Sequence, residues 1–236
     1  MIEPLPVVLV PGLLASARLY AAQIPQLWQC GPVTVADHTR DDTLAAIAAR
    51  ILASAPPVFA LVGLSMGGYV GFEIVRQAPQ RVARLALLDT SARPDTPEQS
   101  AARRAQIALA SQGRLAEILD AQFPRLVARV HREDRALRTL LEQMADEVGA
   151  AAFIRQQTAI MGRADSRPTL GSIRCPTLVL VGADDELTPP ERAEEIAQGI
   201  AGARLVTVPR CGHVSTLEQP AEVTRALLDW LRGSSL

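Results

Sequence analysis

Residues 63–67, Gly-Leu-Ser-Met-Gly, constrain the fold of this chain more than any other stretch. An apolar run at 58–62 comes directly before them, and a helical pattern at 68–77 follows. A strand that turns sharply into a helix presents a serine hydroxyl beside the free N–H groups and positive dipole end of that helix. The flanking glycines make room, because a β-carbon at either position would collide with the neighbouring strand or helix. The pattern predicts Ser65 as a nucleophile; the alternative is a glycine-rich turn in a nucleotide-binding or purely structural sheet.

The composition narrows the classes of function. All 24 basic residues are arginine, and the absence of lysine excludes Schiff-base chemistry, a pyridoxal-phosphate site and a P-loop, because each requires a lysine. The net charge of -1 and the 48% hydrophobic content predict a soluble globular protein with no nucleic-acid or membrane partner. The arginine bias also indicates a bacterial genome rich in G and C.

The cysteines and the N-terminus bear on cofactors and location. Cys30, Cys175 and Cys211 are widely spaced and no Cys/His ligand spacing occurs, so we expect neither a metal site nor a redox motif. Free cysteines are typical of a reducing cytoplasm. Prolines interrupt the first apolar run and no basic region precedes it, which argues against a signal peptide or a membrane span. We therefore predict a cytoplasmic protein.

The order of the apolar runs predicts an α/β fold. Continuous apolar strands that alternate with helices indicate a mostly parallel sheet covered by helices on both faces, here with about six strands. The predicted strands are 7–10, 33–36, 59–62, 85–88, 177–181 and 205–208, and the predicted helices of this core are 19–28, 41–53, 68–77, 190–200 and 220–231.

A block with helical periodicity alone interrupts this alternation. We predict that residues 93–168 form a helical cap insertion above the carboxyl edge of the sheet, and that 1–92 and 169–236 form the core. Open α/β sheets bind ligands at that edge. Twelve arginines and ten acidic residues lie between Ser91 and Pro168, a balance that favours a solvated helix surface over contact with an acidic carrier protein.

A serine nucleophile requires a base, and the base requires an acid that orients it. Of the three histidines, His213 follows the last predicted strand and is the candidate base. His131 lies among charged residues of the insertion, where we expect it at the surface. His38 follows the second predicted strand, at the correct end of the sheet to line a pocket.

The orienting acid is expected directly after the strand at 177–181. Asp184, Asp185 and Glu186 offer three carboxylates there. One of them must be buried enough to hold His213 in the correct tautomer and to stabilise its imidazolium. The residues by themselves leave the choice among the three open.

Together, these motifs resemble those of the α/β-hydrolase superfamily over nearly the whole chain. The family's acid loop commonly reads Gly-x-x-Asp-x-x-Thr/Val-Pro, and that register selects Asp185, with Asp184 as the second choice. Asp89, at the end of the fourth strand, is a position that some hydrolases use instead. The family's histidine segment, Gly-His followed closely by Glu-x-Pro, matches residues 212–220. The resemblance implies a Ser-His-Asp triad that works without a metal or organic cofactor.

An oxyanion hole needs two backbone N–H donors. The family takes one from the residue after the nucleophile, here Met66, and the other from the loop after the first strand, here Leu13. The chain has Pro11 where the family usually has a histidine, so the hydrogen bonds that support this loop are expected to differ. Two extra N-terminal strands common in the family have no room before Val7.

The insertion resembles the cap of small esterases. Residues 153–157, Phe-Ile-Arg-Gln-Gln, look like the Phe-x-x-x-Gln segment of bacterial pimeloyl-carrier-protein methyl ester esterases. The resemblance implies that Phe153 and Gln157 face the acyl group; an amphipathic helix face packed on the core is the alternative. With Leu14 and His38, they make up the predicted substrate pocket.

We therefore predict a carboxylesterase-like serine hydrolase that cleaves a carboxylic ester of a small acyl substrate through an acyl-enzyme intermediate (EC 3.1.1). The same triad serves thioesterases, lactonases and C–C bond hydrolases, and the sequence does not separate these reactions. A ligand-binding protein with the hydrolase fold is the alternative from another class. Dehalogenases and epoxide hydrolases are disfavoured, because they need an aspartate where Ser65 stands. The sequence leaves the natural substrate and the oligomeric state open.

Overall fold

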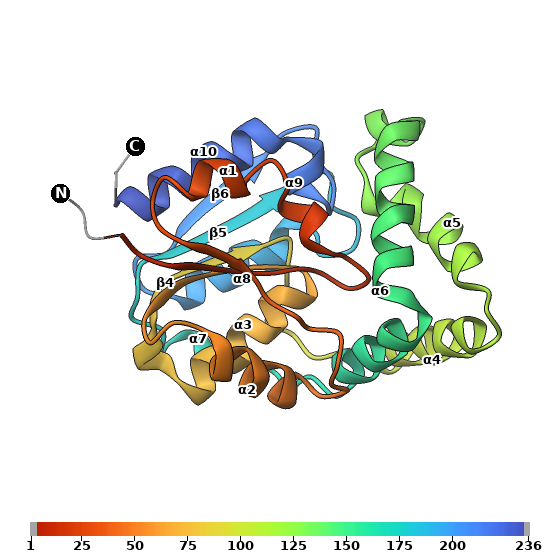
Figure 1. The fold of residues 1–236 in the computed structure, drawn as a ribbon, viewed down its shortest axis with the longest axis horizontal. Helices are drawn as coiled ribbons and strands as arrows, with labels where there is room; N and C mark the ends of the chain where they lie inside the picture. The colour runs from red at the N-terminus through yellow and green to blue at the C-terminus, as the bar shows by residue number, and fades with distance from the viewer. Residues whose placement is uncertain (1–3, 234–236) are drawn as a thin grey trace.

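A six-stranded parallel sheet lies at the centre of the molecule (Figure 1). The computed structural model describes residues 4–233. The strand order is β2-β1-β3-β4-β5-β6, and all neighbouring strands run parallel. The predicted α/β fold with six strands is confirmed. The strands are β1 (Val7–Val10), β2 (Val33–Val35), β3 (Phe59–Leu64), β4 (Val82–Leu88), β5 (Thr177–Gly182) and β6 (Arg204–Val208).

Helices cover both faces of the sheet, with a separate hydrophobic core under each layer. One core holds α2 (Leu44–Ser54), α3 (Met66–Gln77) and α8 (Pro190–Gly199), and the other holds α1 (Ile24–Leu27) and α10 (Pro220–Arg232). Successive strand side chains point to opposite faces, so β1 contributes alternate residues to the two cores. Burial on both faces explains why the strands read as continuous apolar runs.

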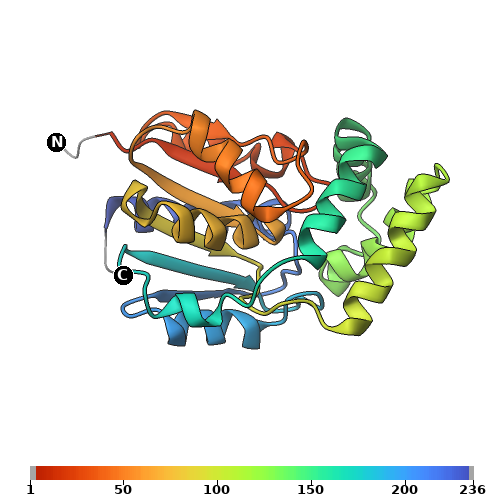
Figure 2. The same ribbon diagram turned by 90° about the horizontal axis from the view of Figure 1, so that it is seen from below.

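A separate group of helices lies beyond the carboxyl ends of the strands (Figure 2). They are α4 (Pro97–Ser111), α5 (Leu115–Leu126) and α6 (Arg135–Met161), which we call the helical block, with a short 3₁₀ turn, Arg129–His131, between the last two. Helix α6 is broken at Gly149, whose φ of 77° is not helical. The break lets α6 change direction beside the sheet.

The helix expected at 19–28 forms as two shorter pieces. A 3₁₀ helix spans Ala17–Tyr20, and α1 begins only at Ile24. Pro25 explains the interruption, because its missing N–H and its ring are tolerated in the first turn of a helix but not in the interior. The structure also adds two short helices, α7 (Arg167–Leu170) and α9 (Ser215–Glu218), whose four residues are too few to give a periodic pattern.

The chain reverses its direction across the sheet next to β1. It passes from β1 to β2 on one side and then returns to β3 on the other side. Ligands of open α/β sheets bind at such a switch point, outside the carboxyl ends of the strands. The loop at 11–14 and the turn at Ser65 follow directly after β1 and β3. Two of the predicted site segments therefore lie side by side.

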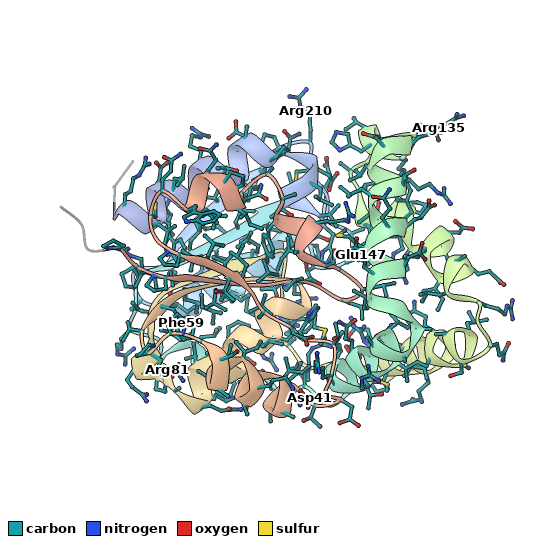
Figure 3. The ribbon with its side chains drawn as sticks, in the orientation of Figure 1. Asp41, Phe59, Arg81, Arg135, Glu147 and Arg210 are labelled. Carbon is teal, nitrogen blue, oxygen red and sulfur yellow. The ribbon has the colours of Figure 1, made fainter. Side chains whose placement is uncertain are left out.

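The amino end of the sheet is closed by packing. Arg81 donates to four backbone carbonyls between residues 52 and 57, and its guanidinium lies 5.8 Å from the centre of the Phe59 ring (Figure 3).

Within residues 4–233, no helix combines the length and apolar character that a membrane crossing requires. In the same range, no three His, Cys, Asp or Glu side chains gather as a potential metal site.

Candidate active site

The turn after β3 holds Ser65 in a strained backbone conformation. Its φ is 55° and its ψ is -114°, a combination that side-chain-bearing residues rarely adopt. A β-carbon at Gly63 would meet the Gly67 carbonyl, and one at Gly67 would meet the Val10 carbonyl. The Ser65 N–H donates to the Leu88 carbonyl at 2.9 Å. The two glycines therefore permit the tight turn that the sequence predicted, and β4 anchors it.

His213 connects Ser65 to Asp185 across the ends of three strands. Its Nε2 lies 2.8 Å from Ser65 Oγ, and its Nδ1 lies 2.8 Å from Asp185 Oδ2. His213 is 4% exposed and Asp185 is 3% exposed. Three side chains from distant parts of the sequence thus form one hydrogen-bonded row, with the hydroxyl at one end and the carboxylate at the other.

The Asp185 carboxylate is held by the backbone that follows it. Its Oδ1 accepts from the Leu187 and Thr188 N–H groups at 2.8 and 3.0 Å, and its Oδ2 accepts from the Thr188 hydroxyl at 2.8 Å. Burial opposes ionisation, but His213 and these hydrogen bonds outweigh it and hold the pKa of Asp185 below its usual value. Asp184 is exposed, so the two adjacent carboxylates occupy opposite environments.

Two opposing effects act on His213. Burial disfavours the imidazolium and by itself lowers the pKa of His213, whereas the Asp185 carboxylate stabilises the charged ring and raises it. The electrostatic effect wins, so the pKa of His213 lies above the usual value of 6.5. The ring is therefore ready to accept a proton, as a base must be.

Asp89 is a second carboxyl group buried close to this row. It accepts from the Gly182 N–H at 2.9 Å and from the Ser215 hydroxyl. Burial and the negative charge of Asp185 raise the pKa of Asp89 to about 8. Asp89 therefore links β4 to the end of β5 and to the start of α9, the helix that follows the histidine loop in the chain.

The loop at 11–14 and the first turn of α3 present free backbone donors. Among the described residues, neither Leu13 nor Met66 donates its N–H to a protein acceptor. The Leu14 N–H donates to Gln156 Oε1 at 3.0 Å, and the Gly12 carbonyl lies 2.9 Å from Nε2 of the neighbouring histidine, His38. A glutamine of α6 and the buried His38 thus support the loop in which Pro11 stands where the resemblance leads one to expect a histidine.

Glu218 fixes the histidine loop to the helical block. Its buried carboxylate accepts from the Gly212 N–H at 2.9 Å and from the Ala128 N–H at 2.7 Å. His131 Nδ1 lies 2.9 Å from the same carboxylate. We expected His131 at the surface. It is half-buried instead, with its ring against the Glu218 carboxylate.

A cavity of about 350 Å³ opens beside Ser65 and His213. Leu13, Leu14 and Phe153 line it, as the sequence predicts for the last two, together with apolar side chains of the helical block. The structure places the other two expected pocket residues, His38 and Gln157, elsewhere. His38 lies under the loop at 11–14, where burial lowers its pKa. Gln157 is fully buried between α4 and α6, where it pairs with side chains of α4.

Sequence reasoning missed Gln156 and Thr188. Gln156 adjoins Gln157 in the segment that resembles an esterase cap, and it is Gln156 that reaches the loop after β1. Thr188 belongs to the Thr-Pro pair that closes the acid loop, and its hydroxyl lies within 3.2 Å of His213 Nδ1. In both cases the sequence contains the segment, but only packing selects the residue.

Comparison with known families settles the class of the chain. The sequence model described as "Alpha/beta hydrolase family" matches residues 7–226. The chain belongs to the alpha/beta hydrolase family. The family assignment agrees with the order of the three motifs and with the position of the serine turn after β3.

Named relatives within the alpha/beta hydrolase family include esterases. A thermophilic esterase from Thermogutta terrifontis, solved with malate bound, is 32% identical, with 97% of this chain and 90% of that chain covered and a TM-score of 0.89. A pimeloyl-[acyl-carrier protein] methyl ester esterase from Aromatoleum aromaticum is 29% identical, and 82% of each chain is covered. The enol-lactonase from Burkholderia xenovorans shares the fold at 24% identity and a TM-score of 0.87, with 98% of this chain and 92% of that chain covered.

Proposed function

We propose that this alpha/beta hydrolase is a carboxylesterase that cleaves an ester of a small acyl substrate through an acyl-enzyme intermediate. The observation that carries the proposal is the hydrogen-bonded row from Ser65 through His213 to Asp185 at the wall of the cavity. In this mechanism His213 takes the Ser65 proton while Oγ attacks the ester carbonyl. Asp185 holds the ring in the required tautomer and stabilises the imidazolium.

The free N–H groups of Leu13 and Met66 are proposed to bind the oxyanion that develops on the substrate. A donor of this type typically contributes about 3–4 kcal/mol of transition-state stabilisation. His213 then protonates the leaving alcohol. Water attacks the acyl-enzyme with His213 again as base, which releases the acid and restores the Ser65 hydroxyl.

The helical block supplies the walls that make the site selective. We infer that residues 93–168 form a cap domain and that 1–92 with 169–236 form the catalytic core. Phe153 from α6 and the apolar residues of α5 enclose the cavity, which excludes water from the acyl chain. A cytoplasmic location and a bacterial origin stay predictions from the sequence.

A substrate panel tests the proposed reaction. We expect the highest kcat/KM on short p-nitrophenyl and methyl carboxylic esters, with lower values for matched thioesters and lactones and for C–C bond substrates. Two named esterases among the relatives support this order. Labelling of Ser65 by a fluorophosphonate, followed by turnover of the acyl-enzyme, separates an enzyme from a binding protein. A folded protein that turns over none of the esters would refute the proposal.

The pH dependence of the reaction follows from the pKa of His213. The base must be neutral, and Asp185 raises the pKa of His213 above 6.5, so activity is lost as the pH falls through a value above 6.5. We therefore expect the acid limb of kcat/KM in the neutral range, higher than an unperturbed histidine would give. Titration of released acid on a neutral methyl ester measures this limb. A rate that stays constant down to pH 4 would contradict the role of His213.

A further inference from the structure

The charge on the cavity wall is one-sided. Within residues 4–233, five arginines line the cavity next to Ser65, and no aspartate or glutamate does. The whole chain carries 24 basic and 25 acidic residues, so the excess is local and does not follow from composition. The arginines of the lining are Arg93, Arg103, Arg125, Arg163 and Arg192.

Two of these arginines share one buried carboxylate behind the wall. Arg103 Nε lies 2.8 Å from Asp95 Oδ2, and Arg163 also pairs with Asp95, whose side chain is 2% exposed. Arg103 also donates to Gln157 Oε1 at 2.7 Å, and Arg163 Nε donates to the Arg93 carbonyl at 2.9 Å. Two guanidinium groups and one carboxylate leave a fixed net charge of +1, and we call these three residues the Asp95 cluster.

The Asp95 cluster lies near the nucleophile. The Arg163 guanidinium is 4.5 Å from the centre of the Tyr69 ring, and Tyr69 also lines the cavity. Tyr69 and Ser65 both line the cavity, and the Tyr69 N–H in the first turn of α3 donates to the Ser65 carbonyl at 3.4 Å. A group bound by the cluster is therefore only a short chain away from a carbonyl at Ser65.

Two of the other three arginines of the lining add positive charge to the same cavity. Arg93 is neutralised by Glu195 at 2.9 Å, whereas Arg125 and Arg192 form no salt bridge with any described residue. Arginines elsewhere in the helical block behave differently: Arg135 points away from the molecule at one end of α6 (Figure 3). The sequence-based expectation of a solvated arginine surface therefore holds for Arg135, and also for Arg93 and Arg125, which are exposed, but not for the two arginines of the Asp95 cluster.

We propose that the cavity binds an ester whose acyl part carries a carboxylate several carbons from the scissile bond, in its simplest form a half-ester of a dicarboxylic acid. The inference rests on the proposed esterase function and names its substrate class. A monovalent carboxylate balances the charge of the Asp95 cluster, and guanidinium groups bind carboxylates through paired, charge-assisted hydrogen bonds. Apolar side chains that line the same cavity suit the methylene chain, for example Phe153, Ile118 and Met144.

A pair of substrates that differ only in charge tests this inference. Methyl hydrogen adipate carries the carboxylate, and the methyl ester of adipic acid monoamide is its neutral counterpart. Hydrogen bonds to a charged group are worth enough to give the acid about a tenfold higher kcat/KM, mainly through a lower KM. Equal rates on the two esters would overturn the inference and leave the esterase function standing. Failure on these and on all neutral p-nitrophenyl esters would refute the esterase function as well.

Neighbouring arginines on α4 provide a matched pair of variants. Arg103→Gln removes one guanidinium of the Asp95 cluster and is expected to reduce the acid-to-amide ratio of kcat/KM to near one. Arg104→Gln removes the same charge from an exposed position outside the cavity lining, and is expected to keep the wild-type ratio. Arg192 lines the cavity and forms no salt bridge with any described residue. If Arg103→Gln fails to fold, the acid-to-amide ratio of Arg192→Gln provides a second test. A wild-type ratio in folded Arg103→Gln or Arg192→Gln would contradict the proposal.

Discussion

Ser65→Ala is expected to lower kcat for ester hydrolysis by about 10⁴- to 10⁶-fold, the range found when the nucleophile of a Ser-His-Asp triad is removed. The Ser65 hydroxyl makes its described hydrogen bond to His213, while the turn itself is held by backbone contacts. The fold should therefore survive the change. Hydrolysis of a p-nitrophenyl ester, with thermal unfolding of both proteins as the control, measures the two effects separately.

The double variant gives a sharper reading of the same site. If Ser65 and His213 act as one unit, Ser65→Ala with His213→Ala should be no slower than Ser65→Ala alone, because the loss is already complete. A further large loss in the double variant would show that the two residues contribute independently. Ser65→Ala that keeps more than roughly a tenth of the wild-type rate would exclude Ser65 as the nucleophile, since loss of a nucleophile costs orders of magnitude.

The fold could be predicted because its determinants are local in the sequence. Each buried strand reads as a continuous apolar run, and turns such as the one at Ser65 need glycines that the sequence displays. The order of the strands in the sheet could not be predicted from the sequence. It depends on pairing between strands that are far apart in the chain, such as β1 with β3. The prediction of a single helix at 19–28 was wrong in detail. Pro25 divides its periodic pattern into two shorter helices.

The side chains around the cavity were harder to predict, because they depend on the phase of α6. The break at Gly149 means that the faces of the second half of α6 cannot be extrapolated from the periodicity of its first half. As a result, Gln156 reaches the loop after β1 while Gln157 turns toward α4. The arginine lining depends in the same way on the phase of another helix, α4: Arg103 lines the cavity, whereas its neighbour Arg104 is exposed outside the lining.

Asp185→Asn is expected to lower kcat by about 10⁴-fold, because the amide favours the wrong tautomer of His213 and leaves the imidazolium without its counter-charge. Asp184→Asn, one residue away, is the matched control and should keep near wild-type activity, since Asp184 is exposed. Both variants are compared on one p-nitrophenyl ester at a pH well above the acid limb. An inactive Asp184→Asn with an active Asp185→Asn would show that the predicted register of the acid loop is wrong.

Asp89 is the remaining candidate for the acid, and its protonation argues against it. Burial and the Asp185 charge raise the pKa of Asp89 and favour its neutral form, whereas His213 and the hydrogen bonds of the acid loop lower the pKa of Asp185 and favour its ionised form. A neutral carboxyl group cannot stabilise an imidazolium by charge. Asp89→Asn should therefore lose far less activity than Asp185→Asn and should act mainly on stability, through the contacts to Gly182 and Ser215. Equal losses in the two variants would instead make the two carboxyl groups a joint acid.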